Sequence, residues 1–165
     1  MIGNVLDLSK LESGQLELES IAFDWDDVIQ AAVDTFSVDV ARKGVELIAD
    51  CDRLPRKLVG DPTRLKQIVL NLISNAIKFT THGEIVVRST FSERDGRAAI
   101  VLSVADTGIG IPADVLPRLT EKFVQASATT NREYGGSGLG LAICKELTEA
   151  MAGTLTIESE QGKGS

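Results

Sequence analysis

The sequence predicts an α/β fold: a two-layer sandwich in which a mixed β-sheet is covered on one face by three main helices. Three observations lead to this prediction. Residues 61–80 repeat apolar side chains at helical spacing behind a capping aspartate. Residues 85–91 and 98–105 are alternating, β-branched runs on either side of Asp95-Gly96, a favourable hairpin turn. Strand patterns alternate with helical ones along the chain, as in layered α/β domains.

The strands are predicted from alternating or β-branched runs at residues 15–20, 45–49, 85–91, 98–105 and 154–159. The two runs that flank Asp95-Gly96 are expected to pair antiparallel. A loop with Pro55 is predicted at 51–60, and a mobile loop at 121–134, which has no periodicity and is rich in small polar residues.

Helices are predicted from their start and stop signals. Residues 1–14 place apolar side chains every three residues before Gly14, which is expected for the end of a longer helix that pairs with a partner. Asp24 is expected to cap a helix that ends at Gly44, with a buried stripe of Ile29, Val33, Phe36 and Val40. A short helix is predicted at 114–119. The last helix follows YGGSGLGL and ends at Gly153, with Leu141, Leu147 and Met151 directed inward.

The helix predicted at 61–80 carries two different stripes. Asp61 is placed to cap it, and Pro62 takes the first position, where a missing N–H costs nothing. The apolar stripe, expected to pack on the sheet, is Leu65, Ile68, Leu72, Ala76 and Phe79. The polar stripe is Arg64, Gln67, Asn71, Asn75 and Lys78. Asn is a poor helix former, so two of them in mid-helix suggest a face that holds hydrated Mg²⁺ and phosphates. Taken alone, the stripe is explained more simply as a solvated surface.

Length, charge and composition exclude several classes of function. The 165 residues, 43% hydrophobic and 25% charged, suit one globular domain. A net charge of −7 disfavours nucleic acid and anionic membranes, so an anionic ligand needs a locally positive pocket. Cys51, Cys144 and His82 are too few for a disulfide framework, a histidine metal site or a Ser-His-Asp triad. No apolar run approaches a membrane span, and a reducing, cytoplasmic setting is expected.

Two glycine-containing stretches point to a nucleotide. Asp106 precedes Gly108 and Gly110, so its carboxylate can accept a hydrogen bond from the exocyclic amine of adenine while the base lies against the glycines. The glycines of GGSGLGL let backbone N–H groups at a helix start approach a polyphosphate. They fit neither the phosphate-loop nor the dinucleotide pattern. Each stretch alone is also explained by a turn aspartate and by a flexible or closely packed linker.

Four stretches resemble, in order and spacing, the N, G1, F and G2 boxes of sensor histidine kinases: LKQIVLNLISNAIKFT, DTGIGI, EKFVQ and YGGSGLGLAI. TLTIESEQGKGS is similar to the end of their catalytic domain, and VLDLSKLESGQLELE resembles the junction with their dimerising, histidine-bearing domain. The resemblance implies the GHKL-type ATP-binding fold, shared with gyrase, MutL proteins and the large heat-shock chaperones. Residues 15–165 would form the catalytic ATP-binding domain, with its last strand cut short, and residues 1–14 a remnant of the second helix of the dimerisation domain.

Carried over residue by residue, the resemblance implies a Mg-ATP site. Asn75 is the implied Mg²⁺ ligand, Asn71 lines the phosphate site through water, and Lys78 contacts phosphate. Asp106 binds the adenine amine, with Gly108 and Gly110 against the base. The implied lid and phosphate-binding turn are formed by Phe123, Arg132, Tyr134, Gly136, Gly138, Leu139 and Gly140, with Arg132 placed to close on the terminal phosphate.

Asn71 separates this chain from the ATP-hydrolysing relatives, which carry Glu there, because an amide cannot take a proton from water. The implied function is transfer of the γ-phosphoryl group of Mg-ATP to a histidine of the dimerisation domain, in two-component signalling with a response-regulator receiver domain downstream. The histidine-bearing helix is missing and His82 is interpreted as a turn residue, so the chain is expected not to phosphorylate itself. The fragment is expected to be monomeric and without direct membrane contact, and the parent kinase homodimeric.

Two alternatives remain open. A degenerate domain of the same fold would use nucleotide only as a regulatory ligand, although all the polar box residues are present. A GHKL hydrolase or an anti-sigma-type serine kinase would share the boxes, but Asn71 argues against hydrolysis and the helix remnant against the anti-sigma group.

Overall fold

The computed structural model describes residues 16–52, 57–94, 97–122 and 138–165. Several predictions fall outside these residues: the helix end at 1–14, the Asp95-Gly96 turn and the loop residues Phe123, Arg132, Tyr134 and Gly136.

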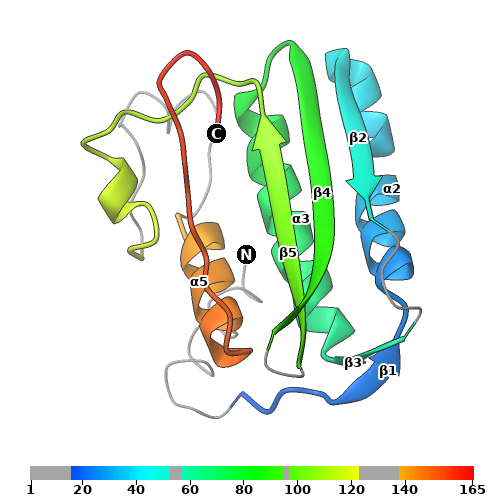
Figure 1. Ribbon diagram of the computed structural model, residues 1–165. Coiled ribbons are helices and arrows are strands. Elements are labelled where there is room, and N and C mark those ends of the chain that lie inside the picture. The colour runs from blue at the N-terminus through cyan, green and yellow to red at the C-terminus, as the bar shows by residue number, and fades with distance from the viewer. Residues whose placement is uncertain (1–15, 53–56, 95–96, 123–137) are drawn as a thin grey trace.

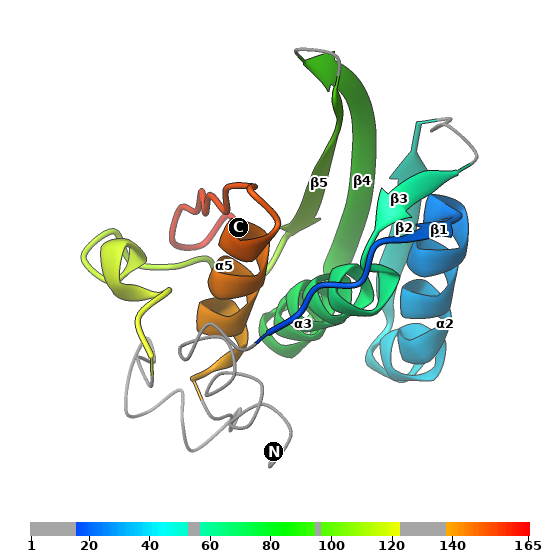
Figure 2. The ribbon, with the colours of Figure 1, turned by 90° about the horizontal axis from the view of Figure 1, so that it is seen from below.

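The described residues form two layers (Figures 1 and 2). The main sheet has the strand order β2-β4-β5, with β2 at Val45–Cys51, β4 at Gly83–Arg94 and β5 at Arg97–Asp106. Strand β2 is parallel to β4, whereas β4 and β5 are antiparallel, so the sheet is mixed. Three helices lie on one face of it: α2 (Trp25–Lys43), α3 (Pro62–Phe79) and α5 (Gly140–Ala150). The predicted two-layer α/β sandwich is confirmed.

Helix α2 begins and ends where the sequence predicts. The Asp24 carboxylate accepts a hydrogen bond from the Asp26 N–H at 3.1 Å. At the other end Gly44 has a φ of 68°, a left-handed conformation that favours glycine. The indole N–H of Trp25 donates to Ser89 Oγ on β4 at 3.0 Å inside the core. This buried hydrogen bond ties the start of α2 to the sheet.

The first strand lies later than predicted. Residues 16–20 are not in a strand, and β1 (Ile21–Phe23) pairs antiparallel with β3 (Leu58–Gly60) in a separate small sheet. The N–H of Glu19 donates to the Asp61 carboxylate at 3.1 Å. The chain before β1 is therefore tied to the start of α3 rather than to a neighbouring strand.

Helix α3 has apolar side chains on two sides, which corrects the predicted single stripe. Asp61 caps it as expected, accepting from the Arg64 N–H at 2.9 Å. Its sheet-facing core residues are Val69, Ile73, Ala76 and Ile77. Ile68 and Leu72, which were expected on that face, pack instead with Ile143, Cys144 and Leu147 of α5. A helix that lies between a sheet and a second helix needs two apolar faces, and one stripe describes only one of them. In α5, likewise, Ile143 and Cys144 are fully buried, whereas the predicted Leu141 is only half-buried.

The predicted strand at 154–159 is wrong. That segment runs back over α5 in both views (Figures 1 and 2), with Leu155 packed on the α5 cluster. Its end bonds to the loop after β5, because Ser159 Oγ accepts from the Ile111 N–H at 2.8 Å. An isolated bridge joins Glu160 and Gly164. The short helix expected at 114–119 is a 3₁₀ turn, η1 (Leu116–Arg118).

Candidate functional site

The two asparagines of α3 face the start of α5. A Cβ on Gly140 would lie 3.8 Å from Asn71 Oδ1 and 3.9 Å from Asn75 Nδ2. Both asparagines are half-buried. Because Gly140 has no side chain, the backbone of α5 approaches both carboxamides, and the polar stripe does not point into open solvent.

The start of α5 presents backbone N–H groups. Leu139 takes the N-cap position, and no side chain of the described residues caps the helix there. The Leu139 side chain is 1% exposed and anchors this turn in the cluster between α3 and α5. Gly138 before it has a φ of 69°. A helix start carries partial positive charge and suits an anion. The structure thus brings Gly138, Leu139 and Gly140 together beside Asn71 and Asn75.

Lys78 adds a positive charge near the end of α3, three residues after Asn75. Its ammonium lies 4.8 Å from the centroid of the Phe79 ring. Partial burial removes hydration and lowers the pKa of Lys78. An ammonium that has lost part of its water interacts more strongly with an anion than a fully hydrated one.

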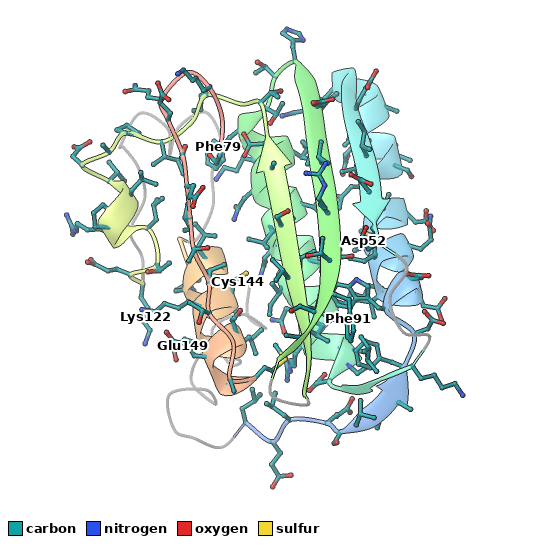
Figure 3. The ribbon with its side chains drawn as sticks, viewed as in Figure 1. Asp52, Phe79, Phe91, Lys122, Cys144 and Glu149 are labelled. Carbon is teal, nitrogen blue, oxygen red and sulfur yellow. The ribbon has the colours of Figure 1, made fainter. Side chains whose placement is uncertain are left out.

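The loop that carries Asp106 is fastened to the end of α3. Asp106 is the last residue of β5, and its Oδ1 accepts from the Gly108 N–H at 2.8 Å. The Ile109 N–H donates to the Phe79 carbonyl at 3.2 Å. A Cβ on Gly108 would lie 2.5 Å from that carbonyl oxygen, so only glycine allows the approach. Phe79 lies beside the end of β5 in Figure 3.

The Asp106 carboxyl is half-buried, and its environment shifts its pKa. Burial raises the pKa of Asp106, and backbone N–H groups of Gly108 and Ser165 oppose the shift. A partly dehydrated carboxylate is a strong acceptor for an amine and repels a carbonyl oxygen. This position can therefore distinguish adenine from guanine.

The C-terminal residues hold the backbone of Asp106 in place through hydrogen bonds. Sequence reasoning missed this contact. The Asp106 N–H donates to the Ser165 carbonyl at 2.9 Å, and the Ser165 N–H donates to the Asp106 carbonyl at 3.3 Å. A Cβ on Gly164 would lie 1.9 Å from the Asp106 carbonyl oxygen, and one on Gly110 would lie 2.1 Å from that of Glu160. Gly164 of QGKGS and Gly110 of DTGIG thus allow two backbone segments to touch. The glycines of both stretches are visible in the sequence, but the contact between the two segments is not.

Lys43 is a second residue that the sequence did not single out. Its ammonium, at the end of α2, donates to the carbonyls of Ile77, Lys78 and Thr80. These are orphan acceptors at the end of α3, where a cation is favourable. Lys43 therefore fixes the turn that carries Lys78 and anchors the Asp106 loop.

A hollow of about 900 Å³ lies on another side of α3. It runs between α2 and α3, and its lining includes Phe23, Val28, Lys57, Lys66, Leu70 and Asn71. It shares Asn71 with the candidate site but includes neither Asn75 nor Asp106. It is therefore separate from the arrangement at the start of α5.

The part of the chain that the structure describes lacks two further kinds of feature. No three His, Cys, Asp or Glu side chains cluster there as a metal site. None of the helices found there is long and apolar enough to cross a membrane. A divalent cation bound here would therefore depend on carboxamide oxygens, on water and on phosphate oxygens of a bound nucleotide.

Comparisons with known proteins place the chain in a family. Residues 60–165 match the family described as histidine kinase-, DNA gyrase B-, and HSP90-like ATPase. Hybrid signal transduction histidine kinase L of Dictyostelium discoideum is 43% identical over 168 residues, covering 100% of this chain and 10% of that protein. Sensor histidine kinase GacS of Pseudomonas protegens is 42% identical over 167 residues, covering 100% of this chain and 18% of that protein.

A solved structure, full-length ShkA in complex with AMPPNP, matches with a TM-score of 0.84 at 34% identity, covering 99% of this chain and 33% of that chain. The chain thus spans less than a fifth of the length of the two curated relatives named above. It belongs to the family of histidine kinase-, DNA gyrase B- and HSP90-like ATPases, and its relatives within that family are sensor histidine kinases, as the four sequence boxes indicated.

Proposed function

We propose that this chain binds ATP with Mg²⁺ and transfers the γ-phosphoryl group to a histidine on a dimerisation domain outside the chain. The observation that carries the proposal is the position of the Asn71 and Asn75 carboxamides, 3.8 and 3.9 Å from the place that a Cβ on Gly140 would take at the start of α5. Oxygen ligands for a hard cation and N–H groups for phosphate then converge on one place.

The donor set suits Mg²⁺. Carboxamide oxygens are hard ligands, and Mg²⁺ keeps several waters and phosphate oxygens in place of an all-protein cage. Asn75 would hold the ion directly and Asn71 through water, while Lys78 would contact phosphate. The ion would supply neutralisation of the charge on the phosphates.

Adenine specificity is assigned to Asp106. Its carboxylate would accept from the exocyclic amine, with Gly108 and Gly110 against the base. Phe123, Arg132, Tyr134 and Gly136 lie outside the described residues and keep their proposed roles in a lid, with Arg132 on the terminal phosphate.

The transfer needs no base from Asn71. A histidine nitrogen would attack the γ-phosphorus as the bond to the bridging oxygen breaks and ADP leaves. The contribution of this chain is positioning and charge neutralisation. An amide in place of a general base disfavours attack by water. His82, exposed in the bend before β4, is not the proposed acceptor.

The proposed setting is two-component signalling. Two of the relatives are named hybrid and sensor histidine kinases, and ShkA forms a complex with AMPPNP. We assign this chain the same kind of nucleotide, a homodimeric parent kinase, a receiver domain as the downstream partner and a cytoplasmic location. The isolated chain would be a monomer.

Calorimetric titration of ATP, ADP and GTP, with and without Mg²⁺, tests the binding part. We expect the unmodified chain to bind ATP more tightly than GTP. Asn75→Ala should lose the effect of Mg²⁺ on ATP affinity, and Asp106→Asn should lose the preference for adenine. Gln30→Ala is the matched control, because its exposed amide on α2 bonds only within that helix, to Asp34 at 2.8 Å. No binding of Mg-ATP by the unmodified chain would overturn the proposal.

Labelled ATP tests the transfer. With a histidine-bearing dimerisation domain added, acid-labile label should appear on that domain, and the chain alone should stay unlabelled. Binding of Mg-ATP without any transfer to the cognate domain would favour a purely regulatory nucleotide module. Rapid release of inorganic phosphate would indicate a hydrolase.

A further inference from the structure

The loop that carries Asp106 leaves the sheet at Thr107, where the end of β5 lies beside the start of β4 (Figure 1). Ile85 and Asp106 are the last paired residues of these two strands, so Glu84 and Thr107 come next in the register. The Thr107 N–H donates to the Glu84 carbonyl at 3.2 Å. The Glu84 N–H donates back to Thr107 Oγ1 at 3.0 Å. In a regular antiparallel pair a backbone carbonyl accepts this second bond, so the hydroxyl takes the place of the Thr107 carbonyl.

Gly83 leaves the space that the Thr107 hydroxyl occupies. It begins β4 with a φ of 108°, and a Cβ there would lie 2.2 Å from Thr107 Oγ1. Only glycine therefore lets the hydroxyl reach the Glu84 N–H. The hydroxyl can donate its own hydrogen to the carbonyl of Glu84 at 3.3 Å or to that of His82 at 3.5 Å. Thr107 is thus held through both its backbone and its side chain.

Thr107 is also the middle residue of the turn that orients the Asp106 carboxylate. The Gly108 N–H donates to Asp106 Oδ1 at 2.8 Å, so this hydrogen bond spans Thr107. An aspartate that bonds to the N–H two residues later depends on the backbone angles of the residue between them. The two bonds to Glu84 restrict these angles. The direction of the Asp106 carboxylate therefore depends on the contact between Thr107 and Glu84.

We propose that Thr107 is a positioning residue for adenine recognition, because its hydroxyl holds the turn in which Asp106 faces the base. Successive residues of a strand point to opposite faces, and Thr107 is exposed whereas Asp106 is half-buried beside the end of α3. Thr107 thus acts through Asp106 and not by touching the nucleotide. The inference rests on the proposed ATP-binding function and extends it to this residue.

Two substitutions separate the hydroxyl from the bulk of the side chain. Thr107→Ser keeps the hydroxyl and loses the methyl group, whereas Thr107→Val keeps the shape and loses the hydroxyl. Thr35→Val is the matched control. Thr35 is likewise exposed, and its hydroxyl donates to the Ala31 carbonyl at 2.7 Å within α2.

The functional readout is adenine preference: the Kd of GTP divided by the Kd of ATP. Loss of one orienting hydrogen bond should reduce this ratio by roughly 3- to 10-fold in Thr107→Val. Thr107→Ser and Thr35→Val should stay within about twofold of the unmodified chain. A merely structural role would weaken ATP and GTP equally and leave the ratio unchanged. In an Asp106→Asn background, adding Thr107→Val should change the ratio by less than about twofold, because the carboxylate that Thr107 positions is gone.

The second readout needs no nucleotide. Backbone amide exchange at both Glu84 and Gly108 should become at least about threefold faster in Thr107→Val and stay unchanged in Thr107→Ser. Faster exchange at Glu84 alone would show that the hydroxyl holds the strand but not the turn, which would overturn the proposal.

The two readouts also separate this inference from the proposed function. If the unmodified chain does not prefer ATP to GTP, the proposed function fails, and exchange at Gly108 still decides whether Thr107 holds the turn. If the unmodified chain prefers ATP, an unchanged ratio in Thr107→Val would overturn the inference. A serine variant as impaired as the valine variant would overturn it as well.

Discussion

Gly140→Ala should separate folding stability from nucleotide binding. The three nearest atoms to the added methyl would be Asn71 Oδ1 at 3.8 Å, and Asn71 Cγ and Asn75 Nδ2 both at 3.9 Å. These are ordinary van der Waals distances, and the backbone of Gly140 is helical. Alanine is better than glycine in a helix by up to about 1 kcal/mol. The melting temperature should therefore stay the same or rise by up to about 4 °C.

The affinity of Gly140→Ala for Mg-ATP should fall although its melting temperature does not. The methyl would occupy the space between the helix start and the two carboxamides. A phosphate oxygen needs to lie about 2.9 Å from an N–H nitrogen, whereas a methyl carbon keeps its neighbours about 3.5–4.0 Å away. We expect the affinity for Mg-ATP to fall at least about tenfold, which corresponds to about 1.4 kcal/mol.

Thermal unfolding and calorimetric titration of the same samples measure both effects. Gly60→Ala is the matched control, because its Cβ would meet only Phe23 Cε1, at 3.6 Å, away from α5. It should change neither property appreciably. A stable Gly140→Ala chain with undiminished affinity would refute the placement of the phosphates at this helix start. A chain that unfolds would refute the packing described for Gly140.

The remaining predictions concern the other supports of the site. Folding raises the pKa of Asp106 above its ordinary value of 3.8, so just above that pH the folded state keeps a proton that the unfolded chain has lost. Ionised Asp106 therefore costs stability once the pH exceeds the pKa of this group in the unfolded chain. Asp106→Asn should thus melt no lower at pH 7 by calorimetry, yet bind ATP about tenfold more weakly, by titration. Gly164→Ala forces a Cβ to 1.9 Å from a backbone oxygen and should lower the melting temperature by at least about 5 °C, far more than Gly162→Ala, where nothing lies within 4 Å. Lys43→Met should cost about 1 kcal/mol in a urea unfolding curve, whereas Arg42→Met, at an exposed ion pair, should cost almost nothing.

Features with a local chemical signal could be predicted from the sequence. Asp24, Gly44 and Asp61 mark helix ends because a cap acts within one turn of the chain. The antiparallel pair of β4 and β5 follows from alternation around a turn signal. The row of Asn71 and Asn75 is visible at helical spacing, but the resemblance to the N box, and not the row alone, indicated a ligand site.

Features that depend on long-range packing could not be predicted. The second apolar face of α3 exists because α5 packs there, and α5 is far along the chain. Residues 154–159 have a strand pattern but bond to the loop after β5. Ser165 gained its place beside Asp106 from the tertiary fold, and serine as a residue type does not signal that role.

Replacing Mg²⁺ by paramagnetic Mn²⁺ in the presence of ATP tests the central claim most directly. If the metal lies at the carboxamides of α3, Mn-ATP should broaden the side-chain amide signals of Asn71 and Asn75 beyond detection, while that of Gln30 on α2 persists. Mg-ATP, the diamagnetic control, should leave all three visible. Sharp Asn71 and Asn75 signals at saturating Mn-ATP would contradict the claim that these two asparagines hold the metal.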